Sequence, residues 1–185
     1  MHKIILASSS PRRKQLLEWA EIPFDVIVKD TKEDYPPELP IEEVPVHIAR
    51  NKALAVQKEL SEDAVILAAD TVVVLDQTII GKPANREDAI KTLSALSGRQ
   101  HKVITGVVIL KETMETAFSD TTIVDFHKLT IEQIVFYVDK YKPYDKAGAY
   151  AIQEWIGVTG IKSVSGDFYN VMGLPVSRVV KALGG

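Results

Sequence analysis

The 185-residue chain contains no cysteine, so disulfide bridges and thiolate metal sites are excluded. No apolar run approaches the roughly 20 residues that a membrane-spanning helix needs, and we expect no membrane partner. The first residues, MHKIILASSSPRRK, hold an apolar stretch too short for a signal peptide, and the basic residues follow it rather than precede it. A cytoplasmic location agrees with these absences, because reducing compartments disfavour disulfides.

An excess of positive charge is missing as well. The net charge of −3 argues against wholesale nucleic-acid binding, so we expect no nucleic-acid partner, and any anion site must be a local cluster. Apolar residues make up 46% and charged residues 25% of the chain, which is typical of a globular protein with its own core. The length fits a single domain over residues 1–185, with room for two lobes.

Helices and strands are predicted in mixed order. Strands are expected over residues 3–7, 24–28, 64–75, 100–110 and 116–127, with short strands over 157–169. Helices are expected over residues 11–20, 41–60, 85–96, 130–141 and 176–183, and loops over 31–40 and 141–150. Because the elements do not alternate strictly, the pattern predicts an α/β protein with a mixed sheet, in which the β-rich stretch 100–127 forms a second lobe beside a cleft.

The most informative residue is a carboxylate inside an apolar segment. Residues 64–75 read AVILAADTVVVL, broken only by Asp70 and Thr71. Because an isolated ionised carboxylate is very costly to bury, we expect Asp70 beside a compensating charge or metal, or at a strand end that solvent or a ligand reaches. The alternative is that Asp70 and Thr71 form a turn between two short strands, since Asp is a common turn residue.

The segment SSSPRR at residues 8–13 predicts an anion site. It follows a strand and opens a helix, with Ser10 as the N-cap and Pro11 at the first helical position. Backbone N–H groups at a helix N-terminus bind anions, whereas the helix dipole disfavours cations such as Arg12 and Arg13 there unless an anion is bound. The alternative is a solvent-facing basic turn.

Four further residues are candidates for binding or catalysis. Lys52 lies among small residues and Lys82 in a stiff Gly-Lys-Pro turn, although each alone also fits a solvated surface lysine. His101 begins a strand, where a structural role is favoured over acid–base chemistry. Gln153 offers a donor and an acceptor that suit a base edge, the alternative being that DKAGAYAIQ is a tightly packed loop. Together with Asp70, these groups suit a nucleotide phosphate with a metal ion.

Seven segments resemble a known family. In chain order they read SSSPRR, ARNKA, AADTVV, GKP, LSGRQHKVITG, DKAGAYAIQ and GDFYNVMGLP. Spread over almost the whole chain, they resemble the Maf family of nucleoside triphosphate pyrophosphatases. The resemblance implies a fold like that of the inosine triphosphate pyrophosphatases: an elongated mixed β-sheet flanked by helices, with a cleft between two lobes, in a protein that is often a homodimer.

The resemblance also implies roles for individual residues. Asp70 would be the proton acceptor, and substrate choice would be set by Arg12, Thr71 and Gln153. The phosphate and metal site would be lined by Ser8, Arg13, Glu33, Lys52 and Lys82, with Glu33 and Asp70 as the protein ligands of a divalent Mg²⁺ or Mn²⁺ ion.

The segment around Gln153 is similar to the branch of the family that acts on dTTP and UTP. That branch usually reads GIQG, whereas this chain has Ala151 and Glu154 in place of the glycines, and a bulkier acidic rim would retune substrate preference. The implied reaction splits dTTP, UTP or a modified pyrimidine nucleotide into monophosphate and pyrophosphate, a housecleaning activity linked to cell division arrest. The alternative is a non-catalytic nucleotide-binding regulator of septum formation, but a pure binder would not need a carboxylate, which repels polyphosphate.

Overall fold

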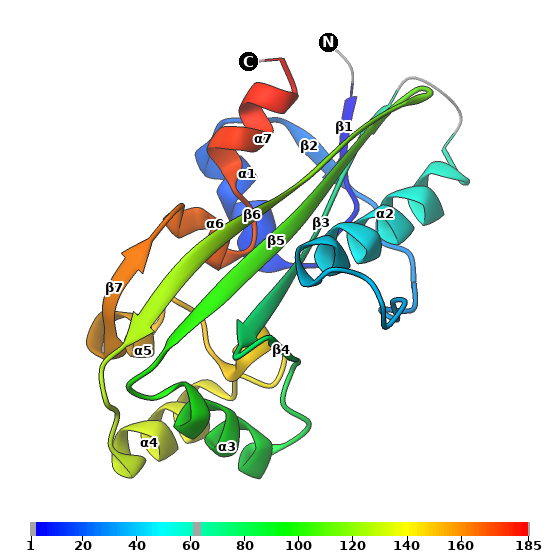
Figure 1. Cartoon of the computed structure of the whole chain (residues 1–185). Helices are drawn as coiled ribbons and strands as arrows, with labels where there is room; N and C mark the ends of the chain where they lie inside the picture. The colour runs from blue at the N-terminus through cyan, green and yellow to red at the C-terminus, as the bar shows by residue number, and fades with distance from the viewer. Residues whose placement is uncertain (1–2, 61–63, 185) are drawn as a thin grey trace. The chain divides into compact units, whose positions relative to one another are not determined.

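The computed structural model describes residues 3–60 and 64–184, which form an α/β fold around a mixed sheet (Figure 1). The strand order is β2-β1-β3-β5-β6-β7, and β4 pairs with β3. The strand pairs β1–β2 and β1–β3 are parallel, whereas β3–β4 and β6–β7 are antiparallel. The strands are β1 Lys3–Leu6, β2 Phe24–Val26, β3 Ala64–Leu75, β4 Thr78–Ile80, β5 Gln100–Lys111, β6 Met114–Phe126 and β7 Ile161–Ser165. The predicted mixed sheet flanked by helices is therefore confirmed.

The chain divides into two compact units. The first comprises Met1–Thr71, Thr105–Asp120 and Gly173–Gly185, and the second comprises Val72–Ile104 and Thr121–Met172. Three strands, β3, β5 and β6, each continue from one unit into the other. The assignment of residues 1–185 to a single domain remains a prediction, which the division into compact units does not test.

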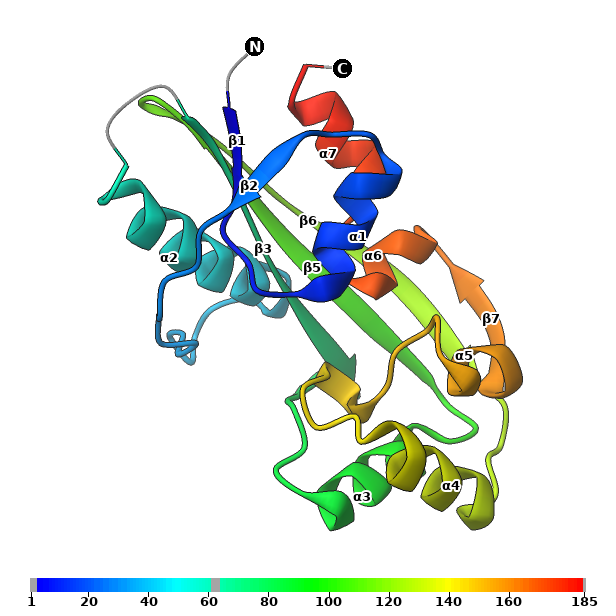
Figure 2. The same cartoon turned by 180° about the vertical axis from the view of Figure 1, so that it is seen from behind.

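The first unit packs helices on both faces of its strands. Its helical elements are α1 Pro11–Trp19, η1 Ile41–Glu43, α2 Val44–Gln57 and α7 Val176–Ala182. Ile5 of β1, Ala7 directly after that strand, and Ile66 and Ala68 of β3 pack in one cluster with Ala49 and further apolar residues of α2. Figures 1 and 2 show α1 and α7 side by side on the opposite face. The alternating apolar positions thus place α2 and the start of β3 against each other.

Gly106 permits an unusually close approach within the first unit. A Cβ atom on Gly106 of β5 would lie 2.2 Å from the Val46 nitrogen and 2.3 Å from the Pro45 carbonyl carbon, in the first turn of α2. Both neighbours are backbone atoms, which cannot rotate away as a side chain would. Only glycine therefore lets β5 pass this close to the helix that carries Lys52.

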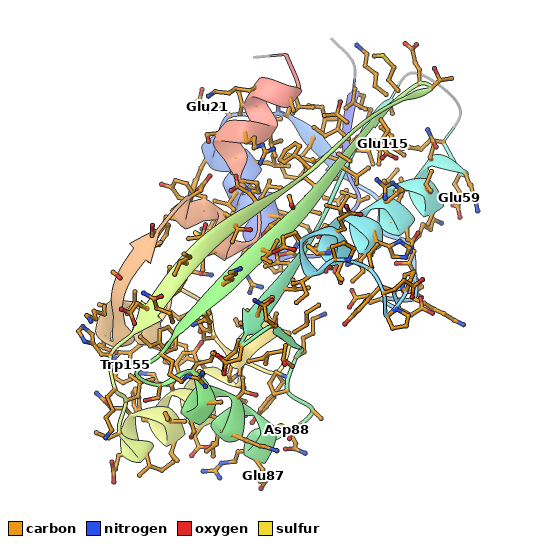
Figure 3. The ribbon with its side chains drawn as sticks, in the orientation of Figure 1. Glu21, Glu59, Glu87, Asp88, Glu115 and Trp155 are labelled. Carbon is orange, nitrogen blue, oxygen red and sulfur yellow. The ribbon has the colours of Figure 1, made fainter. Side chains whose placement is uncertain are left out.

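The second unit is built on capped helices. Its helical elements are α3 Arg86–Leu96, α4 Ile131–Tyr141, η2 Ala147–Ala149, α5 Trp155–Gly160 and α6 Phe168–Met172. The Asn85 side chain caps α3 by accepting the backbone N–H of Asp88 at 2.9 Å, and the acidic Glu87 and Asp88 suit this helix end (Figure 3). Thr130 and Gln133 form a capping box that begins α4. Helix α3 packs on α4.

Most predicted elements are confirmed to within a few residues, but the prediction for residues 157–169 is wrong in part. Residues 157–169 were expected as short strands, yet they form parts of α5 and α6 around β7 alone. Gly157, the first residue of this segment, lies in α5 against the Ile152 carbonyl oxygen, which would be only 1.6 Å from an added Cβ. The helix expected over 41–60 is confirmed over residues 41–57, as the 3₁₀ turn η1 followed by α2. The predicted loop 141–150 is confirmed apart from the three-residue turn η2.

Strand β4 was not predicted, because three residues carry too little periodicity to be recognised. The structure has no helix among the described residues that is long and apolar enough to cross a membrane.

Candidate functional site

Asp70 and Lys52 form the centre of the site in the first unit. Strand β3 continues through Asp70, so the turn between two short strands is wrong. The Lys52 ammonium, on α2, donates to Asp70 Oδ1 at 2.7 Å and to Glu33 Oε1 at 2.9 Å. The side chains of Asp70 and Lys52 are only 13% and 18% exposed, whereas Glu33 is 48% exposed. The predicted compensating charge for Asp70 is therefore confirmed, and Lys52 supplies it.

A second group of polar side chains surrounds Arg13. Its Nε donates to the Gly173 carbonyl at 2.7 Å, and its two terminal nitrogens donate to Ser8 Oγ at 3.0 Å and to Thr71 Oγ1 at 3.1 Å. Thr71 Oγ1 lies 2.8 Å from the hydroxyl of Thr105, which is fully buried. Thr71 follows Asp70 directly on β3. The Arg13 guanidinium thus ties Ser8 and the segment at Gly173 to the strand that carries the carboxylate.

The start of α1 has the predicted form. Ser10 is the N-cap and Pro11 begins the helix, although the Ser10 side chain makes no capping hydrogen bond. Arg13 is 8% exposed, so the alternative of a solvent-facing basic turn is wrong for this residue, and Arg12 beside it is half-buried. Burial lowers the pKa of the Arg13 guanidinium, while the charge of Asp70 acts in the opposite direction.

The carboxylates of Glu33 and Asp70 fit a divalent cation. Both reach the same Lys52 nitrogen, so their oxygens converge on one point that already holds a positive charge. Hard oxygen donors suit Mg²⁺ and Mn²⁺, and Mg²⁺ is commonly held by one or two carboxylates together with substrate phosphates and water. Within residues 3–60 and 64–184, no cluster of three or more His, Asp or Glu side chains forms a metal cage. Two carboxylates alone would leave most coordination positions of such an ion to other oxygen ligands.

Lys82 and Gln153 belong to the second unit and are both exposed. Within this unit, backbone contacts link the segments that carry them. The Gly148 N–H donates to the Gly81 carbonyl at 3.3 Å, and a Cβ on Gly148 would lie 2.9 Å from Val73. Residues 148–150 are buried, as the alternative interpretation of this segment expected, whereas Asp145 and Gln153 are exposed.

His101 has the structural role that was favoured for it. The side chain is 3% exposed, and its Nε2 lies 2.6 Å from the Tyr150 hydroxyl. Burial lowers the pKa of His101 from 6.5 to about 4, against a smaller opposing effect of Asp125. The ring meets both Phe126 and Tyr150 edge-on. A neutral, packed imidazole of this kind stabilises the second unit.

Sequence reasoning missed the residues that support the site. Thr105 and Gly173 were noted only as parts of longer segments, although they hold Thr71 and Arg13 in place. A hydroxyl inside the apolar strand 100–110 was the available signal for Thr105, by the same argument that singled out Asp70. Nothing in the sequence identifies a carbonyl acceptor such as that of Gly173.

A family model described as "Maf-like protein" matches residues 3–185. The chain belongs to this family. Among the relatives of this Maf-like chain is a "dTTP/UTP pyrophosphatase" of Parabacteroides distasonis, 48% identical over 98% of this chain and 95% of the relative. Proteins with the same name in Porphyromonas gingivalis (strain W83) and Cytophaga hutchinsonii are each 49% identical, over 98% and 97% of this chain and 93% and 82% of theirs.

One solved structure, a nucleoside-triphosphatase named dITP/XTP pyrophosphatase from Mycobacterium abscessus, aligns with 69% of this chain and 75% of its own. Its TM-score is 0.39 at 14% identity, a likeness too weak to bear on fold or function.

Proposed function

We propose that this Maf-like chain hydrolyses dTTP and UTP, or modified pyrimidine nucleotides, to the monophosphate and pyrophosphate. The observation that carries the proposal is the half-buried Asp70 carboxylate, held by Lys52 at 2.7 Å in a chain of this family. The names of three relatives at 48–49% identity support the choice of substrate. The proposal includes the cytoplasmic location that a cysteine-free chain favours and the homodimer that the family resemblance implies.

Asp70 would act as the proton acceptor for the attacking water. Lys52 Nζ donates to Asp70 Oδ1 at 2.7 Å. Oδ1 would therefore hold the lysine, and the other carboxylate oxygen would accept the proton from water. Lys52 would then hold Asp70 in place and offer positive charge to the phosphate oxygens. Acid–base assistance of this kind contributes roughly a hundredfold to ten-thousandfold to turnover.

The divalent ion would be held by Glu33 and Asp70, and when bound it would polarise the α phosphate and neutralise charge. The triphosphate would be bound by the positive groups of Arg12, Arg13, Lys52 and Lys82 and by the Ser8 hydroxyl. Arg13 would act mainly through position, because it is buried and bonded to Ser8, Thr71 and Gly173. Phosphoryl transfer needs chiefly this positioning and charge neutralisation.

Substrate choice would rest on Arg12, Thr71 and Gln153. Arg13 donates to Thr71 Oγ1, so that oxygen accepts one bond and shares a second with Thr105. The Thr71 hydroxyl therefore has a fixed orientation, which a site that discriminates between bases needs. A second candidate, the non-catalytic regulator, is disfavoured because Asp70 would repel a bound polyphosphate.

The test is pyrophosphate release in Mg²⁺ from dTTP, UTP, CTP, 7-methyl-GTP and ITP. We expect turnover of dTTP and UTP well above that of the other three. Preference for a purine nucleotide would support pyrophosphatase activity but contradict the role of Gln153 in substrate choice. Binding of nucleotides without any turnover would contradict the pyrophosphatase activity and favour the non-catalytic regulator.

A further inference from the structure

A buried tyrosine joins Ala151 and Glu154, which lie on either side of Gln153 in the chain. The Tyr137 hydroxyl, on α4, accepts the backbone N–H of Ala151 at 3.2 Å and donates to Glu154 Oε2 at 2.5 Å. Ala151 lies two residues before Gln153, and Glu154 directly follows it. Tyr137 is fully buried, so a single fixed oxygen anchors both sides of the segment.

The other carboxylate oxygen of Glu154 faces a lysine. Glu154 Oε1 lies 3.7 Å from Lys146 Nζ, and the Lys146 ammonium also donates to Asp145 at 2.9 Å. The Lys146 side chain is only 11% exposed and that of Glu154 23%, so this ion pair is less screened than one at the surface. Glu154 is therefore held from two directions, by a phenol and by an ammonium.

The chain between the anchors has little freedom. The Glu154 N–H donates to the Ala151 carbonyl at 3.1 Å, which closes a tight turn around Gln153. Helix α5 begins directly after Glu154 at Trp155, which Figure 3 labels, and Gly157 packs against the Ile152 carbonyl. Gln153 is the exposed residue of this turn, while Ala151 and Ile152 are buried.

We propose that Tyr137 and Glu154 are positioning residues for Gln153. Together with Lys146 they form a brace that fixes the direction in which the Gln153 amide meets a base. An amide distinguishes a donor from an acceptor on a base edge only when its own orientation is fixed. In this chain the brace supplies that orientation, and Glu154 links the turn to Tyr137 by its side chain.

The inference rests on the proposed function, because it concerns discrimination by the same site. A displacement of about 1 Å in a positioning group can reduce turnover roughly a hundredfold. Loss of the brace should therefore lower kcat/KM for dTTP about tenfold or more, chiefly by raising KM. The ratio of kcat/KM between dTTP and CTP should fall with it, because the mobile amide accepts either base edge.

The experiment compares Tyr137→Phe with a matched control. Tyr141→Phe removes the same atom from the neighbouring ring, which stacks on Tyr137 with centroids 5.0 Å apart but contributes no bond to the brace described here. Glu154→Gln keeps an acceptor for Tyr137 and removes the charge that faces Lys146. All three proteins are assayed with dTTP, UTP and CTP, and their thermal midpoints are recorded.

Amide hydrogen exchange of the peptide spanning residues 147–157 provides a readout that does not depend on turnover. We expect faster exchange and lost discrimination in Tyr137→Phe, intermediate values in Glu154→Gln, and wild-type behaviour in Tyr141→Phe. Unchanged exchange and unchanged KM in a folded Tyr137→Phe protein would overturn the brace, and so would equal effects of the two tyrosine variants. Absence of turnover in the wild-type protein would overturn the proposed function instead, while exchange still tests the brace.

Discussion

Replacement of His101 should change how the stability of the protein depends on pH. The imidazole is buried against Phe126 and Tyr150, and among the described residues its Nδ1 has no hydrogen-bond partner. Burial lowers the pKa of His101 from 6.5 to about 4. Between these two pH values the ring is neutral in the folded protein but protonated in the unfolded chain. Asp125, the opposing charge, only partly offsets this effect.

The size and sign of the effect follow from linkage. Because the folded pKa is depressed, the stability associated with His101 is complete above pH 6.5 and is lost as the pH falls towards 4. A shift of one pKa unit corresponds to roughly 1.4 kcal/mol. The free energy of unfolding therefore falls by about 2 kcal/mol at pH 5 and by about 3 kcal/mol at pH 4, relative to neutral pH.

The assay is denaturant unfolding at pH 7 and pH 5 for the wild type and for His101→Gln, which cannot titrate. The wild type should lose about 2 kcal/mol more than the variant over this interval. His127→Gln, at an exposed histidine, is the control and should follow the wild type. If His101→Gln shows the same dependence on pH as the wild type, the account of a buried neutral imidazole is refuted.

Three further predictions follow from the fold and the site. Gly106→Ala should destabilise the protein by about 2 kcal/mol or more in denaturant unfolding, because the new Cβ meets backbone atoms, whereas Gly81→Ala, with no atom within 4 Å, should be nearly neutral. Asn85→Ala should cost about 1 kcal/mol of unfolding free energy, and Asn85→Ser should restore most of it. Removal of divalent ions by EDTA should abolish pyrophosphate release and Mg²⁺ should restore it; turnover that persists in EDTA would contradict the role given to Glu33 and Asp70.

The centre of the site could be predicted in part from the sequence. The cost of burying a carboxylate is a local property, so Asp70 in an apolar strand already required a partner. The identity of that partner is a matter of tertiary structure, since Lys52 lies on a helix and resembled a surface lysine when considered alone. The same holds for Thr105 and Gly173, whose contacts with Thr71 and Arg13 join segments distant in sequence.

The fold was predicted best where periodicity is strong. Helix α3 and strand β5 follow long patterns of apolar residues, and their ends match the structure closely. Residues 157–169 were partly misassigned because the three elements there, α5, β7 and α6, are each too short to show a clear periodicity. The packing of Gly157 on the Ile152 carbonyl, which explains the glycine, is visible only in three dimensions.

The most direct test of the proposed function is the turnover of dTTP by Asp70→Asn, measured as pyrophosphate release in saturating Mg²⁺. The substitution keeps the shape of the side chain and removes its ability to accept a proton, so kcat should fall roughly a hundredfold or more, measured well below the thermal midpoint of the variant. Asp25→Asn, at an exposed carboxylate on β2, is the control and should turn over dTTP like the wild type. Near-normal turnover by Asp70→Asn would contradict the assignment of Asp70 as the proton acceptor.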